Sequence, residues 1–228
     1  MSGISRRKVL GGVLAGGLGA MSMGGGAAEG AERTRQRRPL RAFKTEEFYK
    51  DGKFEAAAAK QAYYELMQYH RYPIYDRLRT DEFWALDFGI GKFLEVGMAG
   101  IFWVNNKEHG YFGHEIYLLP GQMIPEHAHV KTDDAGPKLE AWQPRYGLIH
   151  IYGEGEPTPG VEERIPPSHK EAAKARTEKI LKPGEVAGLA KPNEKHWMRA
   201  GPEGAIVTEY ATYHDGKGLR FSHPSVKF

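Results

Sequence analysis

Two histidines separated by a single residue constrain this chain more than any other feature. His127 and His129 follow a Pro120-Gly121 turn, and alternate side chains of a β-strand point to the same face. Two imidazoles on one face of a strand can bind a divalent transition metal together. A second Pro-Gly turn, at positions 183–184, precedes His196. We therefore predict a metal site on a small β-barrel, each half of which runs strand, Pro-Gly turn, ligand.

A third histidine and one carboxylate would complete such a site, and the chain offers three candidates for the carboxylate. Glu140 opens a β-prone run downstream of the His-x-His pair. Asp133 and Asp134 lie closer to the histidines, but Asp-Asp-Ala-Gly-Pro is typical of a turn. Either aspartate stays open as an alternative carboxylate. The predicted metal ligands are His127, His129, Glu140 and His196.

The absence of cysteine restricts the chemistry of this site. None of the 228 residues is Cys, which excludes disulfides, thiolate ligands, iron–sulfur clusters and a cysteine nucleophile. Nitrogen and oxygen ligands suit Mn, Fe, Co, Ni or Zn better than soft Cu(I). The length leaves room for one sizeable domain.

The N-terminal segment differs in composition from the rest of the chain. Residues 1–28 place Arg6, Arg7 and Lys8 before a weakly apolar, Gly-rich run and small residues, which is typical of a cleavable signal peptide. The paired arginines resemble a twin-arginine export signal, and an ordinary secretory signal or an uncleaved anchor is the open alternative. This predicts export to the periplasm or cell envelope, with no membrane association once the signal is cleaved. Residues 29–43 are predicted to be an Arg-rich linker.

The basic excess of the chain, a formal net charge of +3, comes from this N-terminal segment. Eight basic and two acidic residues precede position 42, which leaves 24 basic and 27 acidic residues for positions 42–228. That part of the chain therefore carries a formal charge of −3. A mildly acidic domain does not indicate a nucleic-acid partner.

Hydrophobic patterning divides the remaining chain into two parts. Residues 44–90 predict a helical N-terminal extension, with helices at Thr45–Glu47, Phe54–His70 and Tyr75–Phe83. In residues 91–228, a loop at Pro157–Ser168 and a short helix at Ser168–Thr177 are expected among short β-prone runs. Such runs predict an all-β sandwich or barrel, and they are Phe93–Val104, Gly113–Leu119, Tyr146–Tyr152, Lys179–Lys182 and Ala205–Tyr213.

The histidine spacing resembles the first motif of the cupin superfamily, in which Gly, five residues, His-x-His, Glu and a further Gly follow one another. The matching positions here are Gly121, His127, His129, Glu140 and Gly147. The gap before Glu140 is longer than the usual one, and the second motif, with Gly184, Pro192 and His196, is a looser match. The resemblance implies a mainly β fold, a single jelly-roll-like cupin barrel with an N-terminal helical extension.

Within the cupins, the chain is similar to the D-lyxose isomerase family from about Phe93 to Phe221. The similarity rests on the Pro-Gly-Gln-Met turn at 120–123 and on a C-terminal run with Glu209, His214-Asp215 and Arg220-Phe221. The resemblance implies metal binding by the four predicted ligands and catalysis by Glu209 and Lys138. It implies substrate contacts by Lys131, Trp142, Asp215, Arg220 and Phe221.

The function that follows is a metal-dependent aldose–ketose sugar isomerase. Mn(II) is the expected metal, with Fe, Co, Ni or Zn as the other candidates. Glu209 lies on the last long predicted strand, where alternation can turn it toward the metal. A carboxylate beside a metal-polarised carbonyl can move a proton between neighbouring carbons through an ene-diol.

Two other functions remain open at this stage. The same ligand set suits a non-haem Fe(II) dioxygenase, which would consume O₂. The chain could also be an exported carbohydrate-binding cupin without catalysis. The expected partner is in each case a small molecule, which for the isomerase is a sugar. Whether the chain also forms a homodimer is left open. His114 and His150 lie on predicted strands, and the sequence leaves open whether they point inward.

Overall fold

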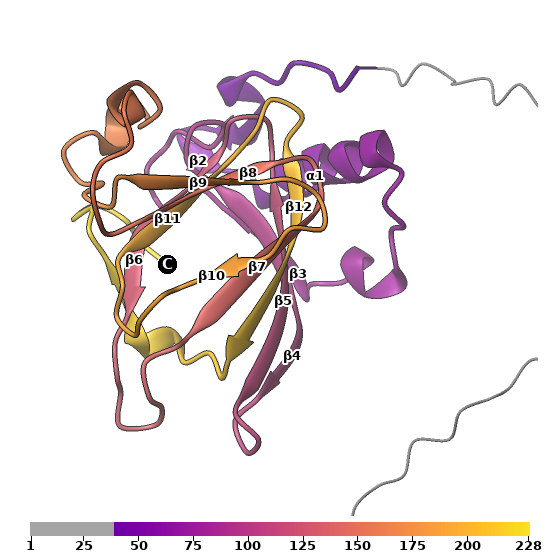
Figure 1. Cartoon of the computed structure of the whole chain (residues 1–228). Coiled ribbons are helices and arrows are strands. Elements are labelled where there is room, and N and C mark those ends of the chain that lie inside the picture. Colours follow the sequence, from indigo (N-terminus) through magenta and orange to yellow (C-terminus); the bar gives the residue numbers. More distant parts are fainter. Residues whose placement is uncertain (1–38) are drawn as a thin grey trace, which may run out of the picture. The chain divides into compact units, whose positions relative to one another are not determined.

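The computed structural model of the chain describes residues 39–228 (Figure 1). The predicted signal peptide, residues 1–28, and residues 29–38 of the predicted linker lie outside this range. The described chain is mainly β, with one α-helix near its beginning. Within residues 39–228, no helix combines the length and the apolar character needed to cross a bilayer.

A short hairpin precedes the helix. The 3₁₀ turn η1 (Thr45–Phe48) leads into β1 (Tyr49–Lys50) and β2 (Lys53–Phe54), which pair with each other. The turn residues Asp51 and Gly52 have φ values of 51° and 74°. Positive φ at both positions of a two-residue turn matches the twist of the flanking strands, so this sequence forms a hairpin.

The helix α1 (Ala56–His70) confirms the predicted helix over Phe54–His70, apart from its first two residues. It ends at Arg71, whose φ of 56° is left-handed, as is common after the last helical turn. The next predicted helix, Tyr75–Phe83, is wrong. Only the 3₁₀ turn η2 (Asp76–Arg79) forms, and Phe83 already starts a strand.

Two antiparallel sheets make up the rest of the fold. The six-stranded sheet has the order β10-β7-β12-β5-β4-β3. Its strands are β3 (Phe83–Leu86), β4 (Met98–Asn106), β5 (Tyr111–Leu118), β7 (Glu140–Tyr146), β10 (Ala187–Gly188) and β12 (Ala205–Thr212). The five-stranded sheet has the order β13-β6-β11-β8-β9. Its strands are β6 (Met123–His129), β8 (Ile149–Gly153), β9 (Thr177–Leu181), β11 (His196–Ala200) and β13 (Leu219–Phe221).

The two sheets face each other across an apolar core (Figure 1). Ile116 and Val207 of the six-stranded sheet pack in one cluster with Ile124 and Met198 of the five-stranded sheet. Two sheets that bury their inner faces against each other form a sandwich. The predicted mainly β, cupin-like fold with an N-terminal helix is confirmed. Among the described residues the strands form these two open sheets and the β1–β2 hairpin, and no closed barrel.

A second core lies between α1 and the outer face of the six-stranded sheet. Tyr63, Leu66 and Met67 lie at helical spacing on one face of α1 and are fully buried. They pack in one cluster with Phe83 and Tyr117 of the sheet. The aromatic residues of the N-terminal extension therefore serve mainly as packing for the sheet that carries part of the site described below.

One predicted strand, Tyr146–Tyr152, is in fact two strands in different sheets. The chain breaks at Gly147, whose φ is 67°, and a Cβ at this position would lie 2.0 Å from the backbone oxygen of Gly204. Only glycine fits both demands. The chain therefore leaves β7 at Tyr146 and enters the opposite sheet at Ile149.

Other predicted boundaries also shift. The predicted strand Phe93–Val104 begins only at Met98. The predicted helix Ser168–Thr177 is wrong, because this segment contains only the end of the 3₁₀ turn η4 (Pro167–His169) and the start of β9. The loop before it holds a further 3₁₀ turn, η3 (Val161–Glu163), and η5 (Gly216–Gly218) precedes β13.

Gln122, in the Pro-Gly-Gln-Met turn, joins the helix to the strand that carries the His-x-His pair. Its side chain is fully buried. The amide oxygen accepts hydrogen bonds from the Tyr63 hydroxyl at 2.7 Å and the Leu119 backbone N–H at 2.9 Å. The amide nitrogen donates to the backbone oxygen of Phe93. This residue therefore satisfies three groups that water cannot reach.

Replacing Gln122 with Leu is expected to destabilise the protein by about 3 kcal/mol or more, because each buried polar group left unsatisfied costs about 1–3 kcal/mol. Urea unfolding measures the loss. The control is Gln61→Leu on the exposed side of α1, which should change stability by less than about 0.5 kcal/mol. Equal stability of the two variants would contradict the assignment.

Candidate metal centre

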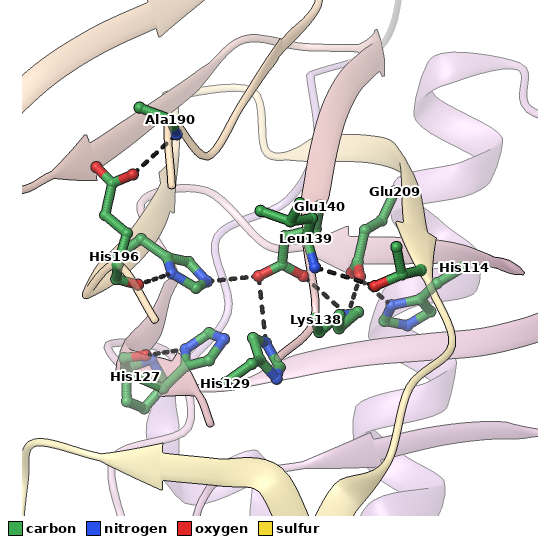
Figure 2. Close-up of polar contacts among 12 residues, drawn as sticks. His114, His127, His129, Lys138, Leu139, Glu140, Ala190, His196 and Glu209 are labelled. Atoms are coloured by element: carbon green, nitrogen blue, oxygen red, sulfur yellow. Dashed lines mark hydrogen bonds and ion pairs between the residues drawn. The ribbon is translucent and has the colours of Figure 1, made fainter. Parts of the chain in front are cut away.

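Three histidines of the five-stranded sheet converge at its inner face. His127 and His129 lie on β6, and His196 on β11 is the direct cross-strand partner of His127. The ring centroids of His127 and His196 are 4.3 Å apart, and those of His127 and His129 are 5.0 Å apart. The strand alternation that motivated the prediction thus turns both β6 histidines to one side (Figure 2).

Backbone carbonyls orient two of these imidazoles. Nδ1 of His127 lies 2.8 Å from the Pro125 oxygen, and Nδ1 of His196 lies 2.9 Å from the Glu194 oxygen. A carbonyl can only accept, so each Nδ1 carries the hydrogen and donates it. The Nε2 lone pair then remains available to a metal. Outer hydrogen bonds of this kind orient histidine ligands in metal sites.

Glu140, at the start of β7 on the opposite sheet, completes the cluster. Its Oε1 lies 2.7 Å from Nε2 of His196 and 3.2 Å from Nε2 of His129. Despite these distances, none of the three buried atoms has a hydrogen-bond partner in suitable geometry. The four side chains each offer one ligand atom, and these atoms all lie within 4.8 Å of one another.

This donor set fits a divalent metal. Three imidazole nitrogens and one carboxylate oxygen converge without satisfying one another, and a cation at their centre would satisfy all of them. The alternative carboxylates do not take part in the cluster. Asp133 and Asp134 are exposed, and Asp134 pairs instead with Lys107 at 2.9 Å and Lys217 at 3.2 Å.

Lys138 connects this cluster to a second buried carboxylate. Its Nζ lies 2.8 Å from Oε2 of Glu140 and also contacts Oε1 of Glu209 on β12. All three side chains are nearly inaccessible to solvent, and the ammonium lies 4.6 Å from the centre of the Phe112 ring. One cation thus bridges two carboxylates inside the sandwich (Figure 2).

The pKa values of these groups reflect burial and this charge arrangement. Burial lowers the pKa of Lys138, but Glu140 and Glu209 outweigh it and raise the pKa above its usual value. Burial raises the pKa of Glu140, but Lys138, His196 and His129 together hold it well below its usual range. For His127, burial and the two neighbouring imidazoles lower the pKa. We therefore treat Lys138 as charged, Glu140 as ionised and His127 as neutral.

Glu209 occupies the inner face of the six-stranded sheet, as its predicted role required. In the register of the sheet it lies directly opposite His114 on β5 and Trp142 on β7. Its Oε2 lies 3.0 Å from Nδ1 of His114. His114 was not predicted as a site residue. Its inward orientation could have been found by pairing its strand with that of Glu209, but the sequence does not specify this register.

A cavity of about 70 Å³ lies between the sheets at this point. The four predicted ligands, Lys138 and Glu209 all line it, as do the predicted substrate contacts Trp142 and Phe221. His214 also lines it, and burial lowers the pKa of this imidazole to about 4. Much of the remaining wall is aromatic, with Trp84, Phe88, Phe102 and Phe112 among its members.

Three predicted substrate contacts do not line this cavity. Lys131 and Arg220 are exposed, and the Arg220 guanidinium donates to the backbone oxygens of Lys217 and Leu219. Asp215 accepts hydrogen bonds from the Thr132 hydroxyl and the Lys217 backbone N–H. Their substrate roles stay predictions that this placement does not support. The backbone of Leu219–Phe221 pairs with β6, and Arg220 within it is exposed.

The arrangement suits proton transfer next to a polarised carbonyl. An ionisable carboxylate, Glu209, faces the same small cavity as a cluster able to hold a metal. A metal stabilises negative charge that develops on oxygen, and a carboxylate can accept a proton from carbon.

Comparison of sequences finds related enzymes over most of their length. No protein-family profile matches the chain. The D-lyxose ketol-isomerase of Thermofilum sp. (strain ex4484_79) is 36% identical over 141 residues, which are 62% of this chain and 77% of that protein. The D-lyxose/D-mannose isomerase of Thermosediminibacter oceani is also 36% identical, over 62% of this chain and 76% of its own length.

Comparison of structures finds the same fold in L-ribose isomerases. The enzyme of Cellulomonas parahominis superposes with a TM-score of 0.60 at 15% identity, over 75% of this chain and 92% of that one. The enzyme of Acinetobacter sp. DL28, solved in complex with L-ribose, gives a TM-score of 0.58 at 16% identity, over 74% and 91%. At these identities the likeness concerns the fold alone.

Replacing Lys138 with Met is expected to destabilise the protein by about 3–5 kcal/mol, because removing one partner of a buried ion pair leaves an uncompensated charge. Thermal and urea unfolding measure this loss. The matched control is Lys131→Met at an exposed position, with an expected change below about 0.5 kcal/mol. A stable K138M protein with unaltered unfolding would show that the two carboxylates do not depend on this lysine.

Replacing His196 with Gln should abolish stoichiometric binding of a divalent metal, measured by elemental analysis after dialysis. The loss of one of four ligands lowers affinity sharply, because Gln cannot supply the Nε2 lone pair in the same place. The control is His109→Gln, on the exposed turn between β4 and β5. Equal metal content in the two variants would place the metal elsewhere.

Proposed function

Because the chain belongs to the D-lyxose ketol-isomerase family and is thus a sugar aldose–ketose isomerase, we propose that it converts D-lyxose or D-mannose into the corresponding ketose. Both sugars are named for its relatives. The observation that carries this assignment is the position of Glu209, which faces the four-residue cluster across one small cavity and is tied to it through Lys138.

Each residue of the site has a proposed role. His127, His129, Glu140 and His196 would hold a divalent metal, which supplies electrophilic polarisation of the sugar's carbonyl and adjacent hydroxyl oxygen. Glu209 takes the proton from C2 of the aldose and returns it to C1, with an ene-diol between the two steps. The hydroxyl proton leaves O2, and O1 gains one, so that the isomerisation is balanced.

Lys138 has two tasks in this scheme. Its ammonium contacts Oε1 of Glu209 and holds that carboxylate at the wall of the cavity. It also binds Oε2 of Glu140, which leaves Oε1 of that carboxylate directed at the histidines. We therefore assign Lys138 to the reacting site, as the group that bridges the two carboxylates.

Mn(II) is our proposal for the metal. The donor set contains imidazole and carboxylate and no sulfur, and such ligands suit Mn(II), Fe(II), Co(II), Ni(II) and Zn(II). A sugar binds through oxygen atoms, which Mn(II) accepts readily. Affinity alone favours the later metals of the series, so that Fe, Co, Ni and Zn remain the alternatives that elemental analysis distinguishes.

The cellular location and the assembly also belong to the proposal. The Arg6-Arg7 pair and the run that follows it support export through a twin-arginine route to the periplasm or cell envelope. That route carries folded proteins, which suits an enzyme loaded with metal before export. A homodimer stays a prediction.

The deciding experiment compares the wild type with Glu209→Gln on D-lyxose and D-mannose, with metal content measured in both. We expect the wild type to form ketose and the variant to lose about 10³-fold in kcat while it keeps its metal, because loss of a general base costs about 10²–10⁴-fold. Glu108→Gln, at an exposed position, is the control and should keep full activity.

Two outcomes would overturn the proposal. A wild-type protein that forms no ketose from either sugar would remove the assigned substrates, and iron-dependent consumption of O₂ would indicate a dioxygenase instead. If E209Q keeps more than a tenth of the wild-type kcat, another group is the base.

A further inference from the structure

His114 is a buried histidine that neither the metal cluster nor the sequence motifs account for. It lies on β5, directly opposite Glu209 of β12. Its Nδ1 lies 3.0 Å from Oε2 of Glu209, while Lys138 contacts the other oxygen, Oε1 (Figure 2). Both oxygens of the proposed base are therefore held by protein groups, one on each side.

The surroundings of His114 determine which of its nitrogens carries the hydrogen. Nε2 is buried and has no hydrogen-bond partner. The ring stacks on Trp84 with centroids 5.6 Å apart and lies 4.9 Å from the Phe102 ring. A hydrogen on Nε2 would have no acceptor in these apolar surroundings. Because the carboxylate can only accept, the hydrogen between His114 and Glu209 lies on Nδ1.

Gly100 makes room for this ring. A Cβ at Gly100 would lie 2.3 Å from Nε2 of His114 and 2.7 Å from the Trp84 ring. Nε2 is therefore packed against the backbone of β4, and only the Nδ1 side of the ring faces a polar partner. Gly100 and the stacked indole of Trp84 together hold the His114 ring in one orientation.

Resting on the proposed role of Glu209 as the base, we propose that His114 is a positioning residue, whose Nδ1–H fixes the plane of the Glu209 carboxylate toward the cavity. Lys138 alone is a poor guide for this, because an ammonium on a four-carbon stem can follow the carboxylate as it turns. The His114 ring, which packs against Gly100 of β4 and Trp84 of β3, cannot follow the carboxylate in this way. Each carboxylate oxygen keeps a second lone pair, which is free to accept the proton from the sugar.

The structure separates this role from metal loading, because His114 is not among the four residues of the metal cluster. His114 also lines the cavity, so KM distinguishes the positioning of Glu209 from a direct contact with the sugar. A loss of orientation at Glu209 should therefore lower kcat and leave KM and metal content unchanged. Displacement of a reacting group by about 1 Å can cost about 10²-fold in rate.

The kinetic test uses two variants of the metal-loaded enzyme with D-lyxose as the substrate. His114→Phe keeps the ring packing and removes the donor, and we expect a drop in kcat of about 30- to 100-fold. His114→Asn places an amide N–H near the position of Nδ1, and we expect it to recover at least a tenth of the wild-type kcat. Metal content and KM should stay within about twofold of wild type in both.

A third variant covers the case in which His114→Phe does not fold. Gly100→Ala keeps the histidine but forces its ring to move, and we expect the same loss in kcat with an unchanged KM. Kinetics overturn the proposal if H114F stays within threefold of wild type, if H114N is no better than H114F, or if the loss appears in KM or in metal content.

An NMR measurement tests the inference without any turnover. In the zinc-loaded protein, long-range ¹H–¹⁵N spectra should show a histidine with a hydrogen on Nδ1 whose signals are absent from the H114N spectrum. A His114 ring with no hydrogen on Nδ1 would overturn the proposal even if the sugar substrate has been assigned correctly. Absence of isomerisation with this tautomer present would instead count against the proposed function alone.

Discussion

A single buried cation, Lys138, holds together the two halves of the reacting site. It binds one carboxylate of the metal cluster, Glu140, and the proposed base, Glu209. Charges buried this deeply are tolerated only when they are paired, so the positions of both carboxylates depend on this lysine. The Glu140 carboxylate beside three imidazoles makes the cavity favourable for a divalent cation.

The two sheets supply different residues of the site. The histidines come from β6 and β11 of one sheet, while Glu140 and Glu209 come from β7 and β12 of the other. The distance between the sheets therefore decides whether a metal cluster can form at all. That distance depends on the apolar core between the sheets and on the packing of α1 against the outer face of the six-stranded sheet. The packing of α1 and of the apolar core therefore affects the geometry of the metal cluster, although it lies outside the cluster.

Some motif residues make their contacts within the fold, outside the cavity. Gln122, in the turn that pointed to the sugar isomerases, is buried and bonded to the helix and to two backbone segments. Arg220 and Asp215, from the other half of that resemblance, satisfy backbone and side-chain partners outside the cavity. A motif can therefore identify a family correctly although several of its residues contact other parts of the fold and do not line the cavity.

The sequence by itself determined the histidine pair, because strand alternation is a local property that needs no partner strand. It also determined the N-terminal helix and favoured Glu140 over Asp133 and Asp134, whose turn chemistry is local as well. The tertiary structure alone decided that Lys138 bridges two carboxylates, that Lys131 lies outside the cavity, and that His114 faces Glu209. These facts depend on strand register and on which sheet a strand joins. A shift by one residue would reverse every side chain of a strand, and such long-range pairing leaves no periodic trace in the chain.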